Sequence, residues 1–177
     1  MVAARFAPCL GVAAIAEQAA AAGKQRLVLP ADSDAIILRW DGSAGLGPSS
    51  HASVLLLHAS GKFSARPLPS NERRRTGSIN ADALQQLMIW IIDENRFATI
   101  SAKAILDEIE AIGRSSGRIF ALMDGGQTHI AVDLPALRHS VVLPALDAAR
   151  SLFPEIDALR RLHAIKQGLL DLTDHAR

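Results

Sequence analysis

The spacing of the hydrophobic residues changes along the chain, and this change restricts the fold more than any other feature of the sequence. In the segment AIILRW, the apolar residues Ile36, Leu38 and Trp40 alternate, which is the period of a half-buried strand. Within 84–92 the apolar residues instead recur every three or four positions, as they do along one face of a helix. Strands and helices therefore occupy separate parts of the chain, which is typical of the α+β class.

Turn residues predict that several strands pair as hairpins. The first hairpin joins Ser53–His58 to Phe63–Leu68 through a turn in which Gly61 can take a positive φ. The second joins Arg118–Met123 to Thr128–Leu134 around the sequence DGGQ, whose glycines tolerate a tight turn. With AIILRW, these segments predict a mostly antiparallel sheet of four or five strands.

Three helical regions follow from capping residues and apolar stripes. Asn80 is a good N-cap for a helix that reaches about Arg96, and Ser101 caps a second helix that ends near Gly113. Residues 141–177 are predicted to be helical, with a break near Phe153-Pro154. We expect these helices to pack on one face of the sheet.

Length and composition favour one domain and exclude several classes of site. A chain of 177 residues fits one domain, which we place at 26–177 with a helical C-terminal part. The formal net charge of +1 argues against a general binder of polyanions. The single cysteine excludes an internal disulfide and any zinc or iron–sulfur site built from several cysteines.

Residues 1–25 have the features of a secretory signal. Arg5 precedes an apolar run from Phe6 to Ala16, and Ala14-Ile15-Ala16 has the small-x-small form of a cleavage site. The run is shorter than the ~20 residues that span a bilayer, and Cys9 is a poor match to a lipidation site. Export to the periplasm or the exterior is favoured. The alternative is an alanine-rich N-terminal helix of a cytoplasmic protein.

Several segments between about residues 35 and 134 follow one another in a recognisable order. They are Ile37-Leu38-Arg39, Gly45 to Pro48, Val54 to Leu57, Ser60-Gly61, the helix from Asn80 and the strand Thr128 to Val132. This order resembles that of a group of exported bacterial proteins, some of them lipoproteins, whose activity is unknown. The resemblance implies export and an α+β domain, and it supplies no catalytic residues to carry over.

The sequence contains no motif of a common enzyme class and predicts no cofactor or metal. The phosphate-binding, dinucleotide, nucleophile-elbow and zinc-protease patterns are all missing. One weaker arrangement remains, because His58 and His129 could meet across neighbouring strands near Asp133 or Asp41. Such a site could carry out acid–base or metal chemistry. Ordinary surface histidines are the competing interpretation.

The most concentrated charge is basic. Arg66, Arg73, Arg74 and Arg75 could bind an anionic or protein partner, although they could also form a solvated loop. The lack of interleaved aromatic residues argues against specific nucleic-acid recognition. Trp90, flanked by isoleucines, leaves an oligomer open as an alternative to a central core helix.

Two functional hypotheses follow. The favoured one is an exported, non-enzymatic binding protein that uses a sheet edge, the segment between Arg66 and Arg75, or the Gly42–Ser50 loop. The alternative is a small hydrolase or metal-dependent enzyme that uses His58, His129 and Asp133.

Intact-mass spectrometry of cytosolic and exported fractions from a bacterial host tests the predicted signal. We expect an exported species that begins at Glu17 or within Ala19–Ala22, because cleavage follows small residues. An uncut chain found only in the cytosol would contradict export.

Overall fold

The computed structural model of the chain describes residues 26–42, 53–66, 74–120 and 126–174. The strands in these residues form one sheet, and the helices include one π-helix, η1, and one short 3-10 helix, η2. The strands are β1 (Ile36–Gly42), β2 (Ser53–His58), β3 (Lys62–Ala65), β4 (Arg75–Ser78), β5 (Gln127–Leu134) and β6 (Leu137–Pro144). The helices are α2 (Ala81–Ile89), η1 (Trp90–Glu94), η2 (Phe97–Thr99), α3 (Ala102–Ser116), α4 (Leu146–Leu152) and α5 (Asp157–Asp174).

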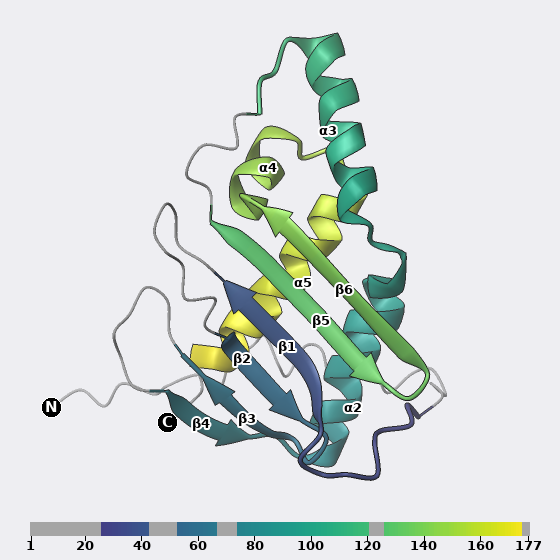
Figure 1. The fold of residues 1–177 in the computed structure, drawn as a ribbon, viewed down its shortest axis with the longest axis vertical. Helices are drawn as coiled ribbons and strands as arrows, with labels where there is room; N and C mark the ends of the chain where they lie inside the picture. The colour runs from purple at the N-terminus through teal and green to yellow at the C-terminus, as the bar shows by residue number, and fades with distance from the viewer. Residues whose placement is uncertain (1–25, 43–52, 67–73, 121–125, 175–177) are drawn as a thin grey trace, which may run out of the picture.

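The sheet has six strands in the order β4-β3-β2-β1-β5-β6, and every neighbouring pair is antiparallel (Figure 1). The α+β class is therefore confirmed, and the sheet has six strands where four or five were expected. The predicted β2–β3 hairpin also forms, and Gly61 in its turn has a φ of +81°. Its second strand spans Lys62–Ala65 where Phe63–Leu68 was expected, and residues 67 and 68 lie outside the described ranges. The strand β1 is central, because it joins the chain's first four strands to the later β5–β6 hairpin.

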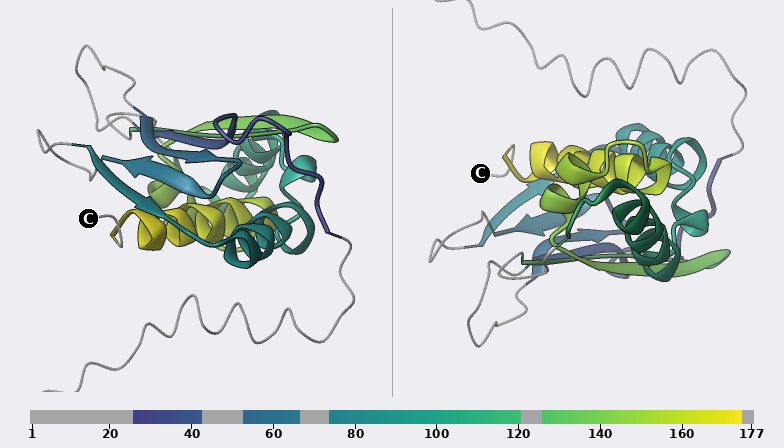
Figure 2. Two further views of the ribbon diagram at one scale, coloured as in Figure 1. Left: turned by 90° about the horizontal axis from the view of Figure 1, so that it is seen from below. Right: turned by 90° about the horizontal axis from the view of Figure 1, so that it is seen from above.

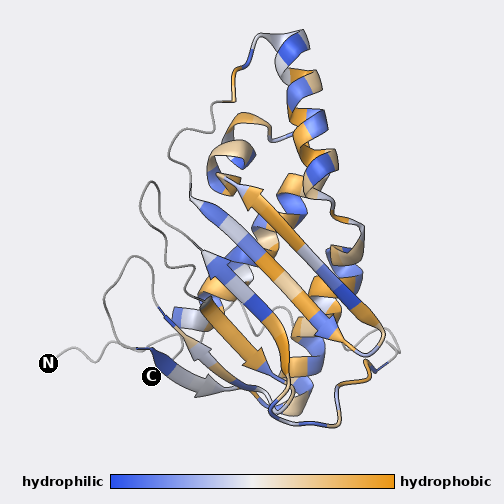
Figure 3. Cartoon of the chain, viewed as in Figure 1, coloured by the Kyte–Doolittle hydropathy of each residue, from blue (hydrophilic) through white to orange (hydrophobic). Residues whose placement is uncertain are grey.

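The described helices cover only one face of the sheet. Figure 2 shows α2 and α5 lying side by side against this face, and none of the described helices lies over the opposite face. The strands alternate accordingly, and the hydropathy colours of β5 illustrate this alternation (Figure 3). Leu38, Trp40, Ile130 and Val132 face the helices and are at most 2% exposed. The opposite face of the sheet, which we call the uncovered face, carries mainly polar side chains.

The predicted helix from Asn80 begins as expected and ends differently. The Asn80 side chain accepts a hydrogen bond from the Ala83 backbone N–H at 2.8 Å, which caps α2. After Ile89 the helix widens into η1, where the Asn95 N–H reaches back five residues to the Trp90 carbonyl at 3.0 Å. The Asn95 side-chain amide donates to the same carbonyl and so closes the helix end.

The predicted DGGQ hairpin is wrong in its partner strand. Arg118–Phe120 is not a strand, and residues 121–125 lie outside the described residues. The β5 strand instead turns at Pro135-Ala136 and pairs with β6, so residues 141–144 are strand and not helix. Proline presets the φ of a turn's first central position, and Val141 and Leu143 alternate inward as a strand requires.

The two other helical predictions differ less. The second helix passes Gly113 and ends at Gly117, whose φ of +71° gives the left-handed conformation of a helix stop. The C-terminal helical part does break at Phe153-Pro154, between α4 and α5. Among the helices described, none combines the length and apolar character that crossing a bilayer requires.

Gly168 sets how closely α5 packs against η1, and this contact gives a test of the fold. A Cβ at Gly168 would lie 2.8 Å from the Trp90 ring. We expect Gly168→Ala to lower the free energy of unfolding by about 1 kcal/mol, because overpacking costs roughly 1–3 kcal/mol and helix propensity returns about 1 kcal/mol. Urea denaturation measures the change. Gln167→Ala, at the exposed neighbouring position, is the control, and an equal or smaller loss in Gly168→Ala would contradict this packing.

Candidate functional site

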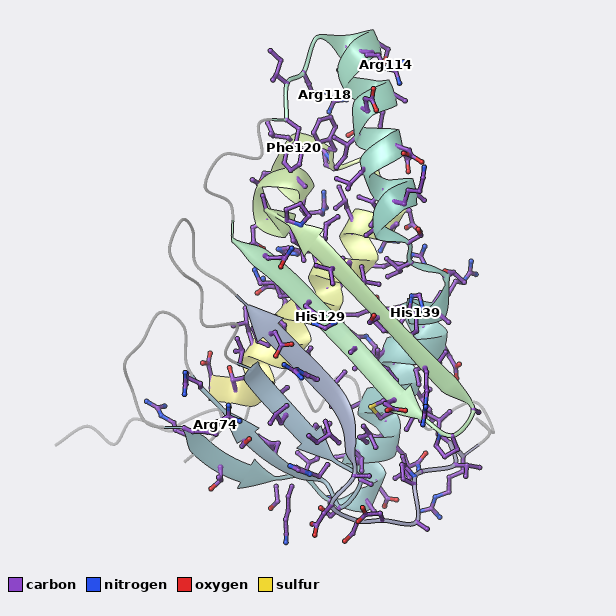
Figure 4. The ribbon with its side chains drawn as sticks, in the orientation of Figure 1. Arg74, Arg114, Arg118, Phe120, His129 and His139 are labelled. Carbon is purple, nitrogen blue, oxygen red and sulfur yellow. The ribbon has the colours of Figure 1, made fainter. Side chains whose placement is uncertain are left out.

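A buried carboxylate on the uncovered face joins an arginine and a histidine. The Asp41 side chain is only 6% exposed, although it lies on the face of the sheet that none of the described helices covers. Arg39 Nε donates to both of its oxygens, at 2.9 Å to Oδ1 and 2.7 Å to Oδ2. His129 Nδ1 lies 3.1 Å from Asp41 Oδ2. We call these three residues the Arg–Asp–His cluster, and Figure 4 shows His129 on the sheet surface.

Strand register brings the cluster together. Asp41 on β1 lies directly opposite His129 on β5, and Arg39 is two positions before Asp41 on the same face. Between them Trp40 points to the opposite face, where it is buried against the helices. The alternation that buries Trp40 therefore also places both charged residues on the uncovered face.

The hydrogen bond to Asp41 fixes which nitrogen of His129 carries the proton. A carboxylate only accepts hydrogen bonds, so Nδ1 must be the donor. In the neutral ring, Nε2 is then left with an unshared electron pair. The His129 side chain is 33% exposed, so this nitrogen is available to a proton, a metal or a ligand.

A pocket of 240 Å³ lies over the cluster. Its walls also include Gly42, Gln127 and the apolar side chain of Val142, which is the neighbour of His129 on β6. Arg39 contributes a side chain that is 48% exposed. Neither of its terminal Nη atoms has a hydrogen bond to a described residue. The pocket therefore combines nitrogen donors with one apolar wall.

The histidine pair expected from the sequence does not form. His58 lies opposite Ile36, five positions along β1 from Asp41, which is roughly 16 Å at the rise of a strand. The His58 ring instead contacts the Asp34 carbonyl at 2.7 Å from Nδ1. Asp133 is also separate, because it forms an ion pair with Arg138 at 2.9 Å. Of the carboxylates considered, only Asp41 reaches His129.

The other described histidines have structural contacts. His139 Nε2 donates to the Ile100 carbonyl at 2.9 Å, and its ring packs edge-to-face against Phe97 at 5.1 Å (labelled in Figure 4). His163 lies 3.5 Å from Asp147. No group of three or more histidine, cysteine or acidic residues in the described ranges could hold a metal ion.

The basic segment lies at the other side of the sheet. Arg74 Nη1 donates to Ser64 Oγ at 2.9 Å, and Arg75 begins the edge strand β4. The Arg66 backbone N–H donates to the Val54 carbonyl at 2.7 Å, which continues the pairing of β2 and β3. Arg73 lies outside the described residues. Figure 4 shows Arg74 well away from His129, so these basic residues and the Arg–Asp–His cluster are separate.

An apolar groove of 410 Å³ lies where the chain leaves α3. Its lining includes Phe120 and Ile119, which is 83% exposed. Arg118 covers the Phe153 ring at 5.0 Å and forms an ion pair with Glu155. The hydrogen bond from Arg118 lowers the pKa of the Glu155 carboxyl below its usual value. These contacts attach the segment after α3 to the corner between α4 and α5.

Asp41→Asn tests the cluster by removing the charge that holds the His129 proton on Nδ1. Losing a hydrogen bond to a charged group, worth about 1.5–3 kcal/mol, should change the ratio of the two neutral tautomers by about tenfold or more. Long-range ¹H–¹⁵N spectra of the histidine rings above about pH 8 measure this ratio. His139, which is hydrogen-bonded elsewhere, is the internal control. An unchanged His129 spectrum would show that Asp41 does not fix the ring.

Comparison of the chain with protein-family models, with curated proteins and with solved structures finds no match. The assignment of a function therefore depends on the geometry of the chain's own residues.

Proposed function

We propose that this chain is an exported, non-enzymatic binding domain that captures an extended segment of another protein at the outer edge of β6. Export rests on the N-terminal signal pattern of residues 1–25. The observation that supports binding is the row of backbone groups along β6 that point away from the sheet. An extended segment can pair with such an edge through main-chain hydrogen bonds.

The geometry of the β5–β6 turn identifies these backbone groups. A two-residue turn places Leu134 opposite Leu137 as a hydrogen-bonded pair. Pairs along an antiparallel ladder alternate, so the N–H and C=O of Arg138, Ser140 and Val142 point away from β5. No described residue has a backbone hydrogen bond to these outer groups, and all three residues are exposed.

The two edges of the sheet differ in how well they accept a further strand. The edge strand β4 has four residues, whereas β6 has eight. Natural sheets commonly protect their edges by short strands, charges and prolines. On β6 the charge of Arg138 and the ring of Pro144 lie towards the ends, and Ser140 and Val142 lie between them. The middle of β6 is therefore the favourable site for strand addition.

The side chains beside this edge indicate the chemistry of the partner. Arg138 and Val142 lie on the uncovered face four positions apart, and Val142 is 40% exposed. An added strand would place one side chain beside each of them. The partner segment should therefore carry an acidic residue and an aliphatic residue four positions apart, with three residues between them. Arg39, Lys62 and Arg138 are among the cationic side chains on this face, and Arg74 donates to Ser64 beside them. Asp41 and Asp133 are carboxylates on the same face.

One observation supports the enzymatic alternative, namely the hydrogen bond between Asp41 and His129. With Nδ1–H held by Asp41, Nε2 could act as a general base on water. In the part of the chain that the structure describes, no hydroxyl or thiol is hydrogen-bonded to His129. Hydrolysis of a chromogenic ester that is lost in His129→Gln and kept in His139→Gln would favour this alternative.

Selection from a displayed library of extended peptides tests the proposed binding edge. We expect enrichment of an acidic residue and an aliphatic residue four positions apart, with three residues between them. Ser140→Pro should weaken binding of the selected peptide about tenfold or more, because it removes an outward N–H and the hydrogen bond that the N–H makes to the peptide. Ser140→Ala keeps the N–H and should bind normally. Amide signals of Ser140 and Val142 should shift on binding.

Two results would contradict this binding edge. If the double variant Arg74→Glu/Arg75→Glu lost peptide binding and Ser140→Pro kept it, the binding surface would be the basic segment and not β6. A concentration-dependent dimer that Ser140→Pro abolishes would make a second copy of the chain, and not another protein, the occupant of β6.

A further inference from the structure

We infer that the Arg–Asp–His cluster forms a binding site for a single carboxylate group, with Arg39 and His129 as the donors and Val142 as an apolar wall. This site differs from strand addition, because its donors are side chains on β1 and β5 and it uses no outer backbone group of β6; the two share only the Val142 side chain.

The arginine is held in an orientation that suits a carboxylate. Its Nε donates to the buried Asp41, so one edge of the guanidinium is fixed to the sheet. The two terminal amino groups have no hydrogen bond to a described residue, and the side chain is half exposed at the pocket. Two parallel N–H groups match the two oxygens of a carboxylate, which is the usual pairing for arginine.

The histidine supplies a second donor when it is protonated. Asp41 holds Nδ1, so a proton gained by the ring goes to Nε2 on the opposite side. Both Arg39 and His129 line the same pocket. A carboxylate there would accept hydrogen bonds from the Arg39 amino groups and from Nε2–H of His129.

The charges around His129 favour a ligand with one negative charge at low pH. From β1 it faces Arg39 and Asp41, whose charges cancel, and from β6 it faces the uncharged Val142. On β5 and β6, Asp133 and Arg138 form their own ion pair farther along the face. Protonation of His129 therefore gives the cluster a net positive charge. The buried Asp41 opposes a dianion such as phosphate, which would bring a second negative charge close to it.

Pocket size and wall chemistry restrict the ligand further. A volume of 240 Å³ suits a small acid, and Val142 can contact an aliphatic group. The carboxylate could belong to a free branched-chain acid or to the C-terminus of a peptide. The chemistry is the same for both, and the experiment separates them.

Titration of the ¹⁵N-labelled protein with isobutyrate tests the carboxylate site. We expect saturable shifts of the His129 ring signals and tighter binding near pH 6 than near pH 8, because protonation of the ring adds the Nε2–H donor and a positive charge. Isobutyramide, which has the same shape and no charge, should cause no shift. Acetyl-Gly-Val with a free carboxylate, compared with its amide, shows whether a peptide terminus binds more tightly than the free acid.

Matched variants separate this site from its surroundings. Arg39→Gln should weaken isobutyrate binding about tenfold or more, because it removes a charged hydrogen-bond donor. Arg138→Gln, which removes an arginine from the same face, should leave binding unchanged, and so should Ser140→Pro. Equal binding of isobutyramide, tighter binding of inorganic phosphate, or affinity independent of pH would each overturn the proposal. The pH comparison uses the unaltered protein, so the test does not depend on the folding of any variant.

Discussion

Burial of one face of the six-stranded sheet against α2 and α5 is the constraint from which the other features of the molecule follow. Trp40 of β1, Met88 of α2 and Ile165 of α5 are at most 1% exposed. Each large apolar side chain buried in this way contributes about 1.5–3 kcal/mol. An exposed ion pair such as Lys103–Asp107 contributes about 0–1 kcal/mol. Apolar burial, and not surface charge, therefore determines the register of the strands.

That register decides what the uncovered face can present. When one residue of a strand points to the helices, its two neighbours point to the opposite face. Burial of Trp40 therefore places Arg39 and Asp41 on the uncovered face, where the Arg39 side chain is exposed to water. The Asp41 carboxylate is only 6% exposed, so it requires hydrogen-bonding or charged partners, because an unpaired buried charge is costly. Arg39 and His129 supply them. Arg39 and His129 thus stabilise the negative charge of Asp41, which strand alternation places on the uncovered face.

Caps and turns, which depend on residues close together in the sequence, predicted much of the fold. They were insufficient to predict which distant segments pair. The cap at Asn80 and the turn at Gly61 depend on residues a few positions apart, so the sequence alone identifies them. The strand β6 was missed because the glycines of DGGQ are a stronger local turn signal than Pro135-Ala136. Packing against the helices overrides that preference. The bond between Asp41 and His129 joins residues 88 positions apart. The sequence offered Asp41 and Asp133 equally as neighbours of His129, because only the strand register distinguishes them.

The pairing of β1 with β5 also has a consequence for how the chain folds. The strands β1 to β4 are consecutive in sequence and can pair through short connections, and β5 and β6 form a local hairpin. The two parts meet only along β1 and β5, after α2, η1, η2 and α3 have intervened. Closing so long a loop costs entropy before its contacts form, so we expect joining of the two half-sheets to limit the rate of folding. The residues on this junction, Asp41 and His129 among them, would then acquire their native neighbours late, and a ligand seated across them would slow separation of the halves.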